Sequence, residues 1–463
     1  MAARSIPTSK KNKKIGGWFV GLVLGTSLIL TLNNIQTAFE SYSDRQLISP
    51  SENFASSKYQ PIQLGYEKLS QYNFSEIDRL AKQLNYSGTS VTELANLLAQ
   101  NAQTQSEKAR IIYAWITQHI TYDVAAFLDA VNNDNYPDIS VKTVLRDRTT
   151  ICSGYSNLYY ALAEAMNLES AIVIGYAKGA TPASEKFQDV NHAWNSVQID
   201  GAWYLLDATW GAGSVRDNKF VPDYKPYYFA TTPEEFINNH YPQDKGWQLL
   251  NKTYTRAEFN SLPSISSRFY NLGLKLVSHK NYQIFTSNRL DIELKIPRNV
   301  VAIAELKQNG QSLLNNPVLS NRNGDRLIVS IAPPETGTYE LTIYAKKKED
   351  LGEYGEVINY QIQAGNSTPQ LPKTFGHFHN SQASLIEPLN GDLKSDWSTY
   401  FNLIVPEAED VQIINTATQQ WTPLAGYGSY FAGHVEVQPG TIAVVAKFPG
   451  GDRYWQLVEY QAK

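Results

Sequence analysis

At 463 residues, the chain is long enough for about two to four domains that each bury a hydrophobic core. Its formal net charge of −4 lacks the basic footprint of a nucleic-acid-binding protein, so we expect no nucleic acid partner. The single cysteine, Cys152, excludes an intramolecular disulfide, so packing must stabilise the fold.

The N-terminal segment has the charge pattern of an export signal. Basic residues within positions 1–14 precede an uncharged, apolar run over positions 15–32. Positive charge before such a run keeps the N-terminus inside and sends the rest of the chain across the membrane. We expect residues 1–38 to be an uncleaved signal anchor, which makes the protein extracytoplasmic and membrane-anchored by a single helix. The alternative is secretion after cleavage behind Ala38, although Gln36 fits the small-residue rule for cleavage sites badly.

A polar tether, residues 39–60, leads into a region with helical patterns. Apolar residues recur with helical spacing in several stretches, so helices are expected at residues 74–84, 91–102, 108–119 and 140–146. His119 falls on the apolar face of the third of these helices and is therefore expected to be packed rather than catalytic. Ser140 is a candidate N-cap of the last one, because its side chain can accept a hydrogen bond from the first turn.

Cys152 comes directly before a run with helical periodicity. Tyr155, Tyr159 and Leu162 recur at the i+3 and i+4 spacing that puts side chains on one face of a helix. A thiol in the first turn of a helix lies where unpaired backbone N–H groups and the helix dipole favour negative charge. The thiolate of Cys152 is therefore expected to be stabilised, as a nucleophilic cysteine requires.

A strand and a β-hairpin are predicted after this helix. Residues 170–179 have the pattern of a strand, and a polar loop separates them from two runs rich in aromatic and β-branched residues. Asp200-Gly201 between the two runs strongly indicates a two-residue hairpin turn. If the turn has two residues, Ile199 lies opposite Ala202 in the hairpin.

Extending this register along the hairpin brings a histidine and a carboxylate together. His192 is then expected opposite Thr209. Trp194 is expected opposite Asp207, and all four side chains share one face of the hairpin. His192 and Asp207 become diagonal neighbours, close enough for the imidazole to bridge to the carboxylate. A histidine oriented by a carboxylate, with Cys152 packed across from it, is the arrangement that activates a thiol nucleophile.

These motifs resemble those of the transglutaminase-like superfamily, most closely the branch that contains the kyphoscoliosis peptidase. The resemblance is carried by GYSNLYYALAEAM after the cysteine, then HAWN, then Trp-Tyr-x-x-Asp-x-Thr-Trp-Gly. It continues upstream through KARIIYAWITQHITYD and downstream through FATTPEEFINNHYPQDKGWQLL, and it covers roughly residues 60 to 290. The resemblance implies that Cys152 is the nucleophile, His192 the general base and acid, and Asp207 the carboxylate that orients the imidazole.

The order of helices followed by an antiparallel sheet predicts an α+β fold. The resemblance implies, more specifically, a papain/transglutaminase-like catalytic core, which we assign to residues 61–275. His240 lies in this core, but its surroundings predict a helix end and a turn, so no role is assigned to it. Four aromatic residues are candidates to line a substrate cleft, with core packing as their alternative role: Tyr155, Trp194, Trp203 and Trp210.

Each catalytic candidate also has a purely structural interpretation. A lone cysteine is usually a small buried hydrophobe, and a lone histidine beside tryptophans is usually a packed core residue. An aspartate near the end of a strand is often a cap or a turn residue. The ordered spacing and the hairpin geometry favour the catalytic interpretation of the three residues taken together. Zinc binding by Cys152 and His192 is a poor alternative because no further ligands are clustered with metal-site spacing, so neither a metal nor a cofactor is expected.

Beyond about residue 276 the pattern becomes wholly β. Short alternating strands recur in two stretches, residues 276–365 and 374–463, which a polar linker of residues 366–373 connects. Two sequence pairs repeat between the stretches: Gly337-Thr338 with Gly440-Thr441, and Tyr360-Gln361 with Tyr460-Gln461. This internal repeat predicts two immunoglobulin-like sandwiches, although the cysteine pair of true immunoglobulin domains is absent.

The sequence as a whole predicts an extracytoplasmic cysteine enzyme. Its triad is expected to act on peptide or glutamine-type amides through a thioester, as a peptidase, a deamidase or a transglutaminase-type acyltransferase. The backbone N–H of Cys152 is one natural donor to the oxyanion. In related thiol enzymes a glutamine upstream of the cysteine often serves as the second donor. Residues 146–151 contain no glutamine, so the second donor is unassigned. The alternative is a non-catalytic protein that uses the same fold as a scaffold. The expected partners are a peptide or protein substrate, a cell-wall or surface polymer, and the membrane through the N-terminal helix.

Overall fold

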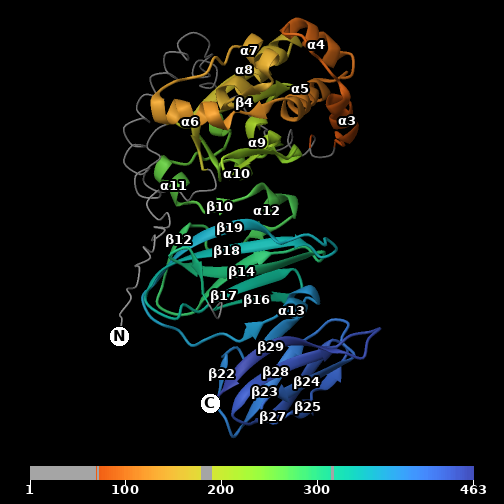
Figure 1. The fold of residues 1–463 in the computed structure, drawn as a ribbon, viewed down its shortest axis with the longest axis vertical. Helices are drawn as coiled ribbons and strands as arrows, with labels where there is room; N and C mark the ends of the chain where they lie inside the picture. The colour runs from red at the N-terminus through yellow and green to blue at the C-terminus, as the bar shows by residue number, and fades with distance from the viewer. Residues whose placement is uncertain (1–68, 70–71, 179–189, 314–316) are drawn as a thin grey trace, which may run out of the picture. The chain divides into compact units, whose positions relative to one another are not determined.

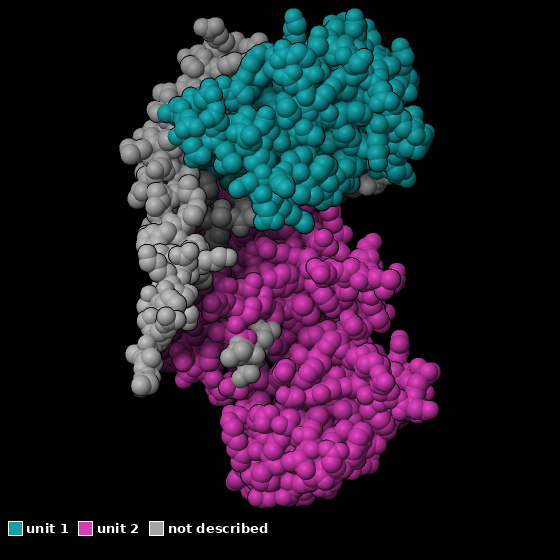
Figure 2. Space-filling model, viewed as in Figure 1, with its two compact units in different colours: residues 1–177, 183–233, 242–251 teal, residues 178–182, 234–241, 252–463 magenta. Residues whose placement is uncertain are grey.

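The computed structural model describes residues 69, 72–178, 190–313 and 317–463. Positions 15–32 and 39–60, where the sequence predicts a membrane segment and a tether, lie outside the described residues. Within the described ranges, no helix is both long and apolar enough to cross a membrane. The chain divides into two compact units, which Figure 2 shows in different colours. Unit 1 comprises residues 1–177, 183–233 and 242–251, and unit 2 comprises residues 178–182, 234–241 and 252–463.

Unit 1 contains the predicted helices together with further ones (Figure 1). They are α3 (Ser75–Gln83), α4 (Val91–Ala99), α5 (Gln105–His119), α6 (Val124–Asn133), α7 (Val141–Asp147), α8 (Cys152–Ala165) and α9 (Ala208–Ala212). Helices α4 to α7 each begin after a residue whose side chain accepts a hydrogen bond from the first turn, namely Ser90, Thr104, Asp123 and Ser140. Such caps satisfy N–H groups that the helix itself leaves without a partner, so local chemistry decides where these helices begin.

An antiparallel sheet in unit 1 packs against α8. Of its five strands, four lie wholly in unit 1: β3 (Ser170–Ala177), β4 (His192–Ile199), β5 (Ala202–Leu206) and β8 (Phe229–Thr231), in the order β8-β5-β4-β3. Tyr159 and Leu162 of α8 share a buried hydrophobic core with Val197 of β4. His119 of α5 is packed as expected, because its ring stacks on that of Trp115 with 4.7 Å between the centroids. The sheet and α8 together form the frame that positions the candidate site.

The hairpin register is confirmed as far as the end of β5. Ile199 pairs with Ala202, and four more pairs follow in the same register. The predicted extension of the hairpin is wrong, because β5 ends at Leu206 and α9 follows. Asp207 caps the N-terminus of α9 and Thr209 lies within that helix, so neither residue belongs to the strand. A carboxylate followed by free N–H groups favours a helix start over continued pairing.

Several short elements complete unit 1 and lead into unit 2. Strands β1 (Thr121–Tyr122) and β2 (Thr149–Thr150) pair in parallel, and β6 (Gly213–Arg216) pairs with β7 (Lys219–Pro222) in antiparallel. The other short elements are η2 (Pro226–Tyr228), α10 (Pro233–Phe236), β9 (His240–Pro242), η3 (Lys245–Gln248), α11 (Arg256–Ser261), α12 (Ser267–Asn271) and α13 (Gly376–Asn380). The parallel pair β1–β2 matters most for the site, because β2 ends directly before α8.

Most of unit 2 forms two β-sandwiches. The first pairs a sheet of β10 (Ser264–Ile265), β12 (Gln283–Thr286), β14 (Val300–Gln308), β15 (Gln311–Ser312), β18 (Gly337–Lys347) and β19 (Gly355–Ala364) with a sheet of β11 (Lys275–Leu276), β13 (Leu290–Lys295), β16 (Val318–Asn323) and β17 (Arg326–Ile331). The second pairs β20 (Lys373–Thr374), β22 (Asp392–Leu393), β24 (Asp410–Asn415), β25 (Gln420–Pro423), β28 (Gly440–Lys447) and β29 (Tyr454–Ala462) with β21 (Ser384–Glu387), β23 (Trp397–Ile404), β26 (Ala425–Tyr427) and β27 (Tyr430–Val437). Each sandwich encloses its own core.

The two sandwiches repeat the same strand pairing. Gly337 opens β18 and Gly440 opens β28, and each glycine pairs with the last residue of the strand after it, β19 or β29. Both ladders contain a register shift, which follows the pair Ile343–Ile358 in the first and the pair Val444–Val458 in the second. Tyr360 and Tyr460 occupy equivalent places in the two buried cores. The repeat seen in the sequence therefore corresponds to a repeat in structure.

Candidate active site

Cys152 is the first residue of α8, and it is buried. The N-cap residue Ile151 has an apolar side chain and makes no side-chain capping hydrogen bond. The side chain of Ile151 therefore gives the N–H groups of the first turn no partner, and the N–H of Gly154 donates instead to the carbonyl of Ile151 at 2.9 Å. The N–H groups of Cys152 and Ser153, which come before it, are directed out of the helix end where the thiol lies. These groups and the helix dipole favour negative charge on the sulfur of Cys152.

The hairpin brings the candidate histidine and aspartate into contact. His192 opens β4, and Asp207 follows β5 directly. The Nε2 atom of His192 lies 2.8 Å from the Oδ2 atom of Asp207, and both side chains are buried. The other carboxylate oxygen, Oδ1, accepts hydrogen bonds from the backbone N–H groups of Thr209 at 2.8 Å and Trp210 at 3.0 Å. Asp207 therefore holds the imidazole with one oxygen and the start of α9 with the other.

The thiol of Cys152 and the imidazole of His192 interact through a hydrogen bond and through charge. Burial alone raises the pKa of Cys152, but the hydrogen bond and the charge of His192 outweigh it and hold this pKa below its ordinary value. Burial likewise opposes the charged imidazole, yet the carboxylate of Asp207 raises the pKa of His192 to about 10. A thiolate beside an imidazolium is therefore the favoured state, because each charge stabilises the other. Since Nε2 faces Asp207, Nδ1 is the ring nitrogen left for the thiol.

Three residues at this site were not singled out from the sequence. The backbone N–H of Ala193 and the side chain of Ser153 both hydrogen-bond the sulfur of Cys152, and both lower its pKa. Tyr122 of β1 is a half-buried neighbour whose phenol interacts electrostatically with Cys152 and Asp207. Ser153 and Ala193 adjoin catalytic candidates in the chain, so the sequence offered a cue for them, whereas Tyr122 lies far upstream.

The four candidate cleft residues separate into two pairs. The ring centroid of Trp194 lies 6.0 Å from that of His192, and the ring of Trp210 lies 5.7 Å from it. Tyr155 is fully buried, and its hydroxyl donates a hydrogen bond to the carbonyl of Ile120 at 2.7 Å. Trp203 is also buried and packs edge-on against another tryptophan ring with 5.1 Å between the centroids. Trp194 and Trp210 thus flank the imidazole, but Trp194 is buried like Tyr155 and Trp203, so Trp210 is the one of the four that is partly exposed.

His240 differs from its expected surroundings. The sequence predicts a helix end and a turn there, whereas the structure places His240 at the start of strand β9. Its ring is buried and stacks on that of Phe236 with 4.0 Å between the centroids. The turn was predicted from the polar residues and the proline around His240, and these residues also fit the short strand that forms.

Family comparisons agree with this combination of site and fold. Residues 92–208 match the model of the transglutaminase-like superfamily, and residues 256–375 match that of the KY-like, immunoglobulin-like domain. The chain therefore contains a transglutaminase-like domain followed by a KY-like immunoglobulin-like domain.

At the level of particular proteins, the chain is homologous to kyphoscoliosis peptidase. It is 31% identical to the Mus musculus protein over 308 residues, which cover 65% of this chain and 44% of the relative. It is 32% identical to the Homo sapiens protein over 297 residues, which cover 63% of this chain and 43% of that relative. Hillarin of Drosophila melanogaster is 31% identical over 217 residues, covering 43% and 26%. The chain thus spans less than half the length of the curated relatives it matches.

Proposed function

We propose that this protein is a cysteine enzyme that transfers acyl groups from peptide or glutamine-type amides through a thioester. One observation carries the proposal: a buried imidazole at 2.8 Å from a buried carboxylate interacts with a thiol at the start of a helix. Covalent catalysis by a thiol requires a nucleophile, a base and an orienting group in hydrogen-bonded order. The transglutaminase-like domain and the relatives named as peptidases support the same reaction class.

The proposed reaction begins with attack of the Cys152 thiolate on the carbonyl carbon of the amide. The carbon–sulfur bond forms, and the carbonyl oxygen becomes an oxyanion. As the intermediate collapses, the carbon–nitrogen bond breaks, and the leaving amine takes a proton from the imidazolium of His192. The thioester that remains is attacked by water or by a second amine, whose proton His192 now accepts. The thiol is thereby released from the acyl group, and Asp207 keeps the imidazole oriented throughout.

The proposal is tested by trapping the acyl-enzyme. The purified full-length chain is incubated with a peptide library that contains glutamine and other amide side chains, then quenched in acid and analysed by mass spectrometry. We expect a peptide-derived mass on Cys152 that hydroxylamine removes, because thioesters are cleaved by that nucleophile. The matched control is Cys152→Ala. If the wild-type chain shows no thioester with any peptide and no turnover, acyl transfer by this site is ruled out.

We also propose that the protein acts outside the cytoplasmic membrane, held by positions 15–32. The support is the sequence alone: basic residues precede an uncharged run, and this order favours translocation of the residues after the run. The test is protease treatment of intact and of permeabilised cells that produce the chain. We expect protease added outside intact cells, converted to spheroplasts, to cleave the residues that follow positions 15–32. Protection of these residues would overturn the orientation.

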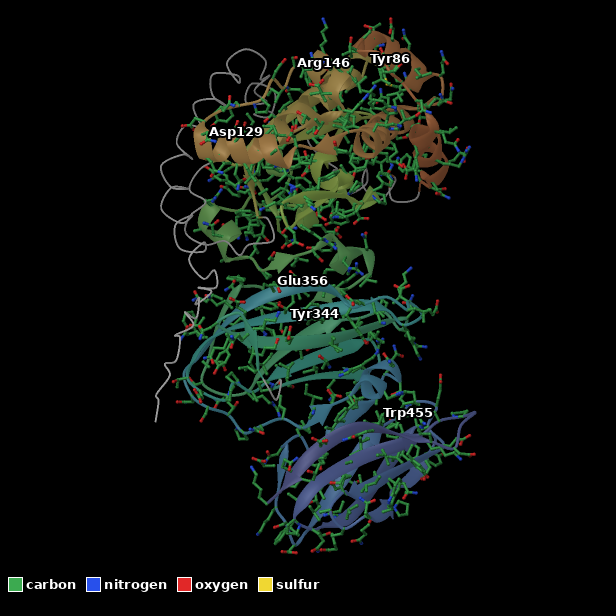
Figure 3. All side chains as sticks on the ribbon, in the orientation of Figure 1. Tyr86, Asp129, Arg146, Tyr344, Glu356 and Trp455 are labelled. Atoms are coloured by element: carbon green, nitrogen blue, oxygen red, sulfur yellow. The ribbon has the colours of Figure 1, made fainter. Side chains whose placement is uncertain are left out.

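A second function, binding of a cell-wall or surface polymer, is proposed for the second sandwich. Large aromatic side chains are exposed on its surface, where they can contact a partner. They are Trp397, Tyr400, Trp421, Tyr427, Tyr430 and Trp455. Tyr400 of β23 lies against His434 of β27 with 4.9 Å between ring centroids, and Tyr427 pairs in register with Tyr430. The ring of Trp455 of β29, labelled in Figure 3, lies tilted against that of His377 with 3.9 Å between the centroids.

Sedimentation with insoluble polysaccharides tests the second function. Peptidoglycan and cellulose serve as two probes, and the full-length chain is compared with the double variant Tyr427→Ala and Tyr430→Ala. We expect the wild-type chain to sediment with one of the polymers and the double variant to remain in solution. Equal sedimentation of both chains would contradict a role for Tyr427 and Tyr430 in binding.

A further inference from the structure

The second oxyanion donor, which the sequence left unassigned, can be sought beside the start of α8. Strand β1 lies parallel to β2, and Tyr122 is in register with Thr150, two residues ahead of Cys152. The backbone N–H of Asp123 donates a hydrogen bond to the carbonyl of Thr150 at 2.9 Å, and that of Thr121 donates to the carbonyl of Arg148 at 2.9 Å. Both bonds flank Tyr122, so the position of its backbone relative to the nucleophile is fixed.

The same strand is also tied to α8 from its other end. The hydroxyl of Tyr155, a residue of α8, donates a hydrogen bond to the carbonyl of Ile120 at 2.7 Å. Tyr122 is followed by Asp123, whose side chain caps α6 through the N–H of Ala126 at 2.8 Å. The chain is therefore anchored on both sides of Tyr122, which leaves this residue little freedom to move away from the thiol.

The phenol of Tyr122 is available as a hydrogen-bond donor. Among the described residues its hydroxyl has no hydrogen-bond partner, and its ring packs against Phe127 with 6.0 Å between the centroids. Its charge environment includes Cys152, which means that the phenol and the thiol share one neighbourhood. Burial, reinforced by the nearby Cys152, raises the pKa of Tyr122 well above its ordinary value. The phenol therefore keeps its proton wherever the thiolate exists.

Other hydroxyls close to the thiol are less suitable. The Oγ1 atom of Thr150 is buried and lies against Gly154, so a substrate oxygen has no room to reach it. The side chain of Ser153 already hydrogen-bonds the sulfur of Cys152. Asn195, another buried polar residue near α8, uses its amide N–H groups for the carbonyls of Ser156 and Ala171. Unlike these three groups, the hydroxyl of Tyr122 belongs to a half-buried side chain and has no hydrogen-bond partner among the described residues.

We propose that the hydroxyl of Tyr122 donates the second hydrogen bond to the oxyanion, opposite the backbone N–H of Cys152. This inference rests on the proposed thiol chemistry and adds a catalytic residue to it. The negative charge that develops on the carbonyl oxygen is then held by two donors, one from the start of α8 and one from β1. A fixed donor aimed at charge that appears only in the transition state lowers the barrier without strengthening substrate binding equally.

Two reactions of the same thiol separate this role from a general effect on the nucleophile. Iodoacetamide alkylates Cys152 by displacement at a saturated carbon, and no oxyanion forms. Para-nitrophenyl acetate acylates Cys152 through a tetrahedral oxyanion. Both rates are measured at one pH on the full-length chain and on Tyr122→Phe, with Cys152→Ala as the blank. The matched control is Tyr160→Phe, because Tyr160 is also a half-buried tyrosine without a hydrogen-bond partner among the described residues, but it lies further along α8.

We expect Tyr122→Phe to slow acylation on the order of 100-fold while alkylation changes less than about threefold. Tyr160→Phe is expected to change neither rate. If Tyr122→Phe leaves the ratio of acylation to alkylation unchanged, the donor role is overturned while the proposed function stands. If wild-type Cys152 resists iodoacetamide altogether, the nucleophile itself is overturned. Thermal unfolding of each variant confirms that the removed hydroxyl did not alter the fold.

Discussion

The starts of α5 and α8 show two different uses of the same helical feature. At α5, Thr104 accepts a hydrogen bond from the N–H of Glu107 at 3.2 Å, and Glu107 in turn accepts one from the N–H of Thr104 at 3.0 Å. At α8, Ile151 makes no side-chain cap, and the next residue is Cys152. The first arrangement satisfies the helix end with its own side chains, whereas the second leaves the end open to a negative charge.

This contrast indicates that α8 is not optimised for its own stability. A side-chain cap stabilises a helix by about 0.5–2 kcal/mol, and α8 forgoes that contribution at the place where the thiol lies. The charge that the open end favours is the thiolate, or later the oxyanion. Helices α12 and α13 also begin without a side-chain cap, so what distinguishes the start of α8 is the thiol that occupies it.

The greatest loss of acyl-transfer activity is expected when the nucleophile at the open end of α8, or its base, is removed. Cys152→Ala and His192→Ala are each expected to reduce acyl transfer on the order of 10⁴-fold or more, because nucleophile and base act as one unit. Folding should be largely retained, since the core of unit 1 does not depend on either side chain. Turnover and thermal unfolding are the measurements. Retained turnover in Cys152→Ala would contradict the mechanism.

Asp207→Asn is expected to have the next strongest effect. Asparagine is also a good N-cap, so the start of α9 should survive the change. The imidazole, however, loses the negative charge that raises the pKa of His192, and losses of the order of 10⁴-fold in turnover are known for such changes. We expect a smaller loss than for Cys152→Ala if part of the orientation remains. A variant with unchanged turnover would show that Asp207 serves α9 alone.

The pH dependence of alkylation measures how strongly the site favours the thiolate. Because the pKa of Cys152 is lowered, the rate of its reaction with iodoacetamide should level off at a lower pH than that of an ordinary cysteine, whose pKa is about 8.5. The rate should fall only as the pH drops through that lowered pKa. In His192→Ala the midpoint should move upward, because burial then acts without the imidazolium. A wild-type rate that rises only near pH 8 to 9 would indicate a structural thiol.

Acyl transfer itself should also decline on the alkaline side. The pKa of His192 is raised to about 10, so the imidazolium that protonates the leaving amine persists up to that pH. Above it the proton is lost, and with it general-acid catalysis. Turnover of an amide substrate is therefore expected to fall near pH 10, which a pH–rate profile measures. A decline already near pH 6.5, the ordinary histidine range, would mean that Asp207 does not hold the proton on His192.

The structural helix start is tested by Thr104→Ala. This variant loses the cap of α5 and should lower the free energy of unfolding by about 1 kcal/mol. The rate of Cys152 alkylation should not change, because α5 contributes nothing to the thiol. Urea denaturation and iodoacetamide kinetics measure the two quantities on the same sample. A large loss of thiol reactivity would show that the two helix starts are not independent.

A change at the N-cap of α8 should have the mildest effect, yet it tests the contrast between the two helix starts most directly. Ile151→Thr introduces a hydroxyl that can cap α8, and Ile151→Val is its matched control of similar shape without a hydroxyl. The threonine should compete with the thiolate for the first-turn N–H groups and slow alkylation about two- to fivefold relative to valine, which corresponds to about 0.4–1 kcal/mol. Equal rates in the two variants would mean that the open helix end does not activate Cys152.

The parts of the site that depend on local patterns could be predicted from the sequence. Helical spacing after Cys152 placed the thiol at the start of α8, and Asp200-Gly201 determined the register of the hairpin as far as Leu206. The extension beyond Leu206 failed because a capping carboxylate competes with strand pairing, and alternation of aromatic residues does not reveal that competition. The contact between His192 and Asp207 was nevertheless predicted. Asp207 directly follows the last residue of β5, so its side chain still lies beside His192 of β4.

Tyr122 and α6 could not be predicted for different physical reasons. Strand β1 has two residues, too few for a period, and its partner β2 lies in parallel and far along the chain. Helix α6 exposes Phe127 and Leu128, so its apolar residues do not form the buried stripe that indicates a helix. Both elements depend on tertiary contacts rather than on their own residues.

The double use of Asp207 makes reactivity a property of the completed fold. One oxygen of this carboxylate secures α9 and the other secures the imidazole, while the thiol depends on the start of α8. These three segments lie apart in the sequence, so a nascent or partly denatured chain carries an ordinary, slowly reacting cysteine. The thiol of Cys152 therefore becomes reactive only when the chain has folded, and it loses this reactivity when the chain unfolds. For the proposed enzyme, this means that an unfolded chain would not modify its neighbours.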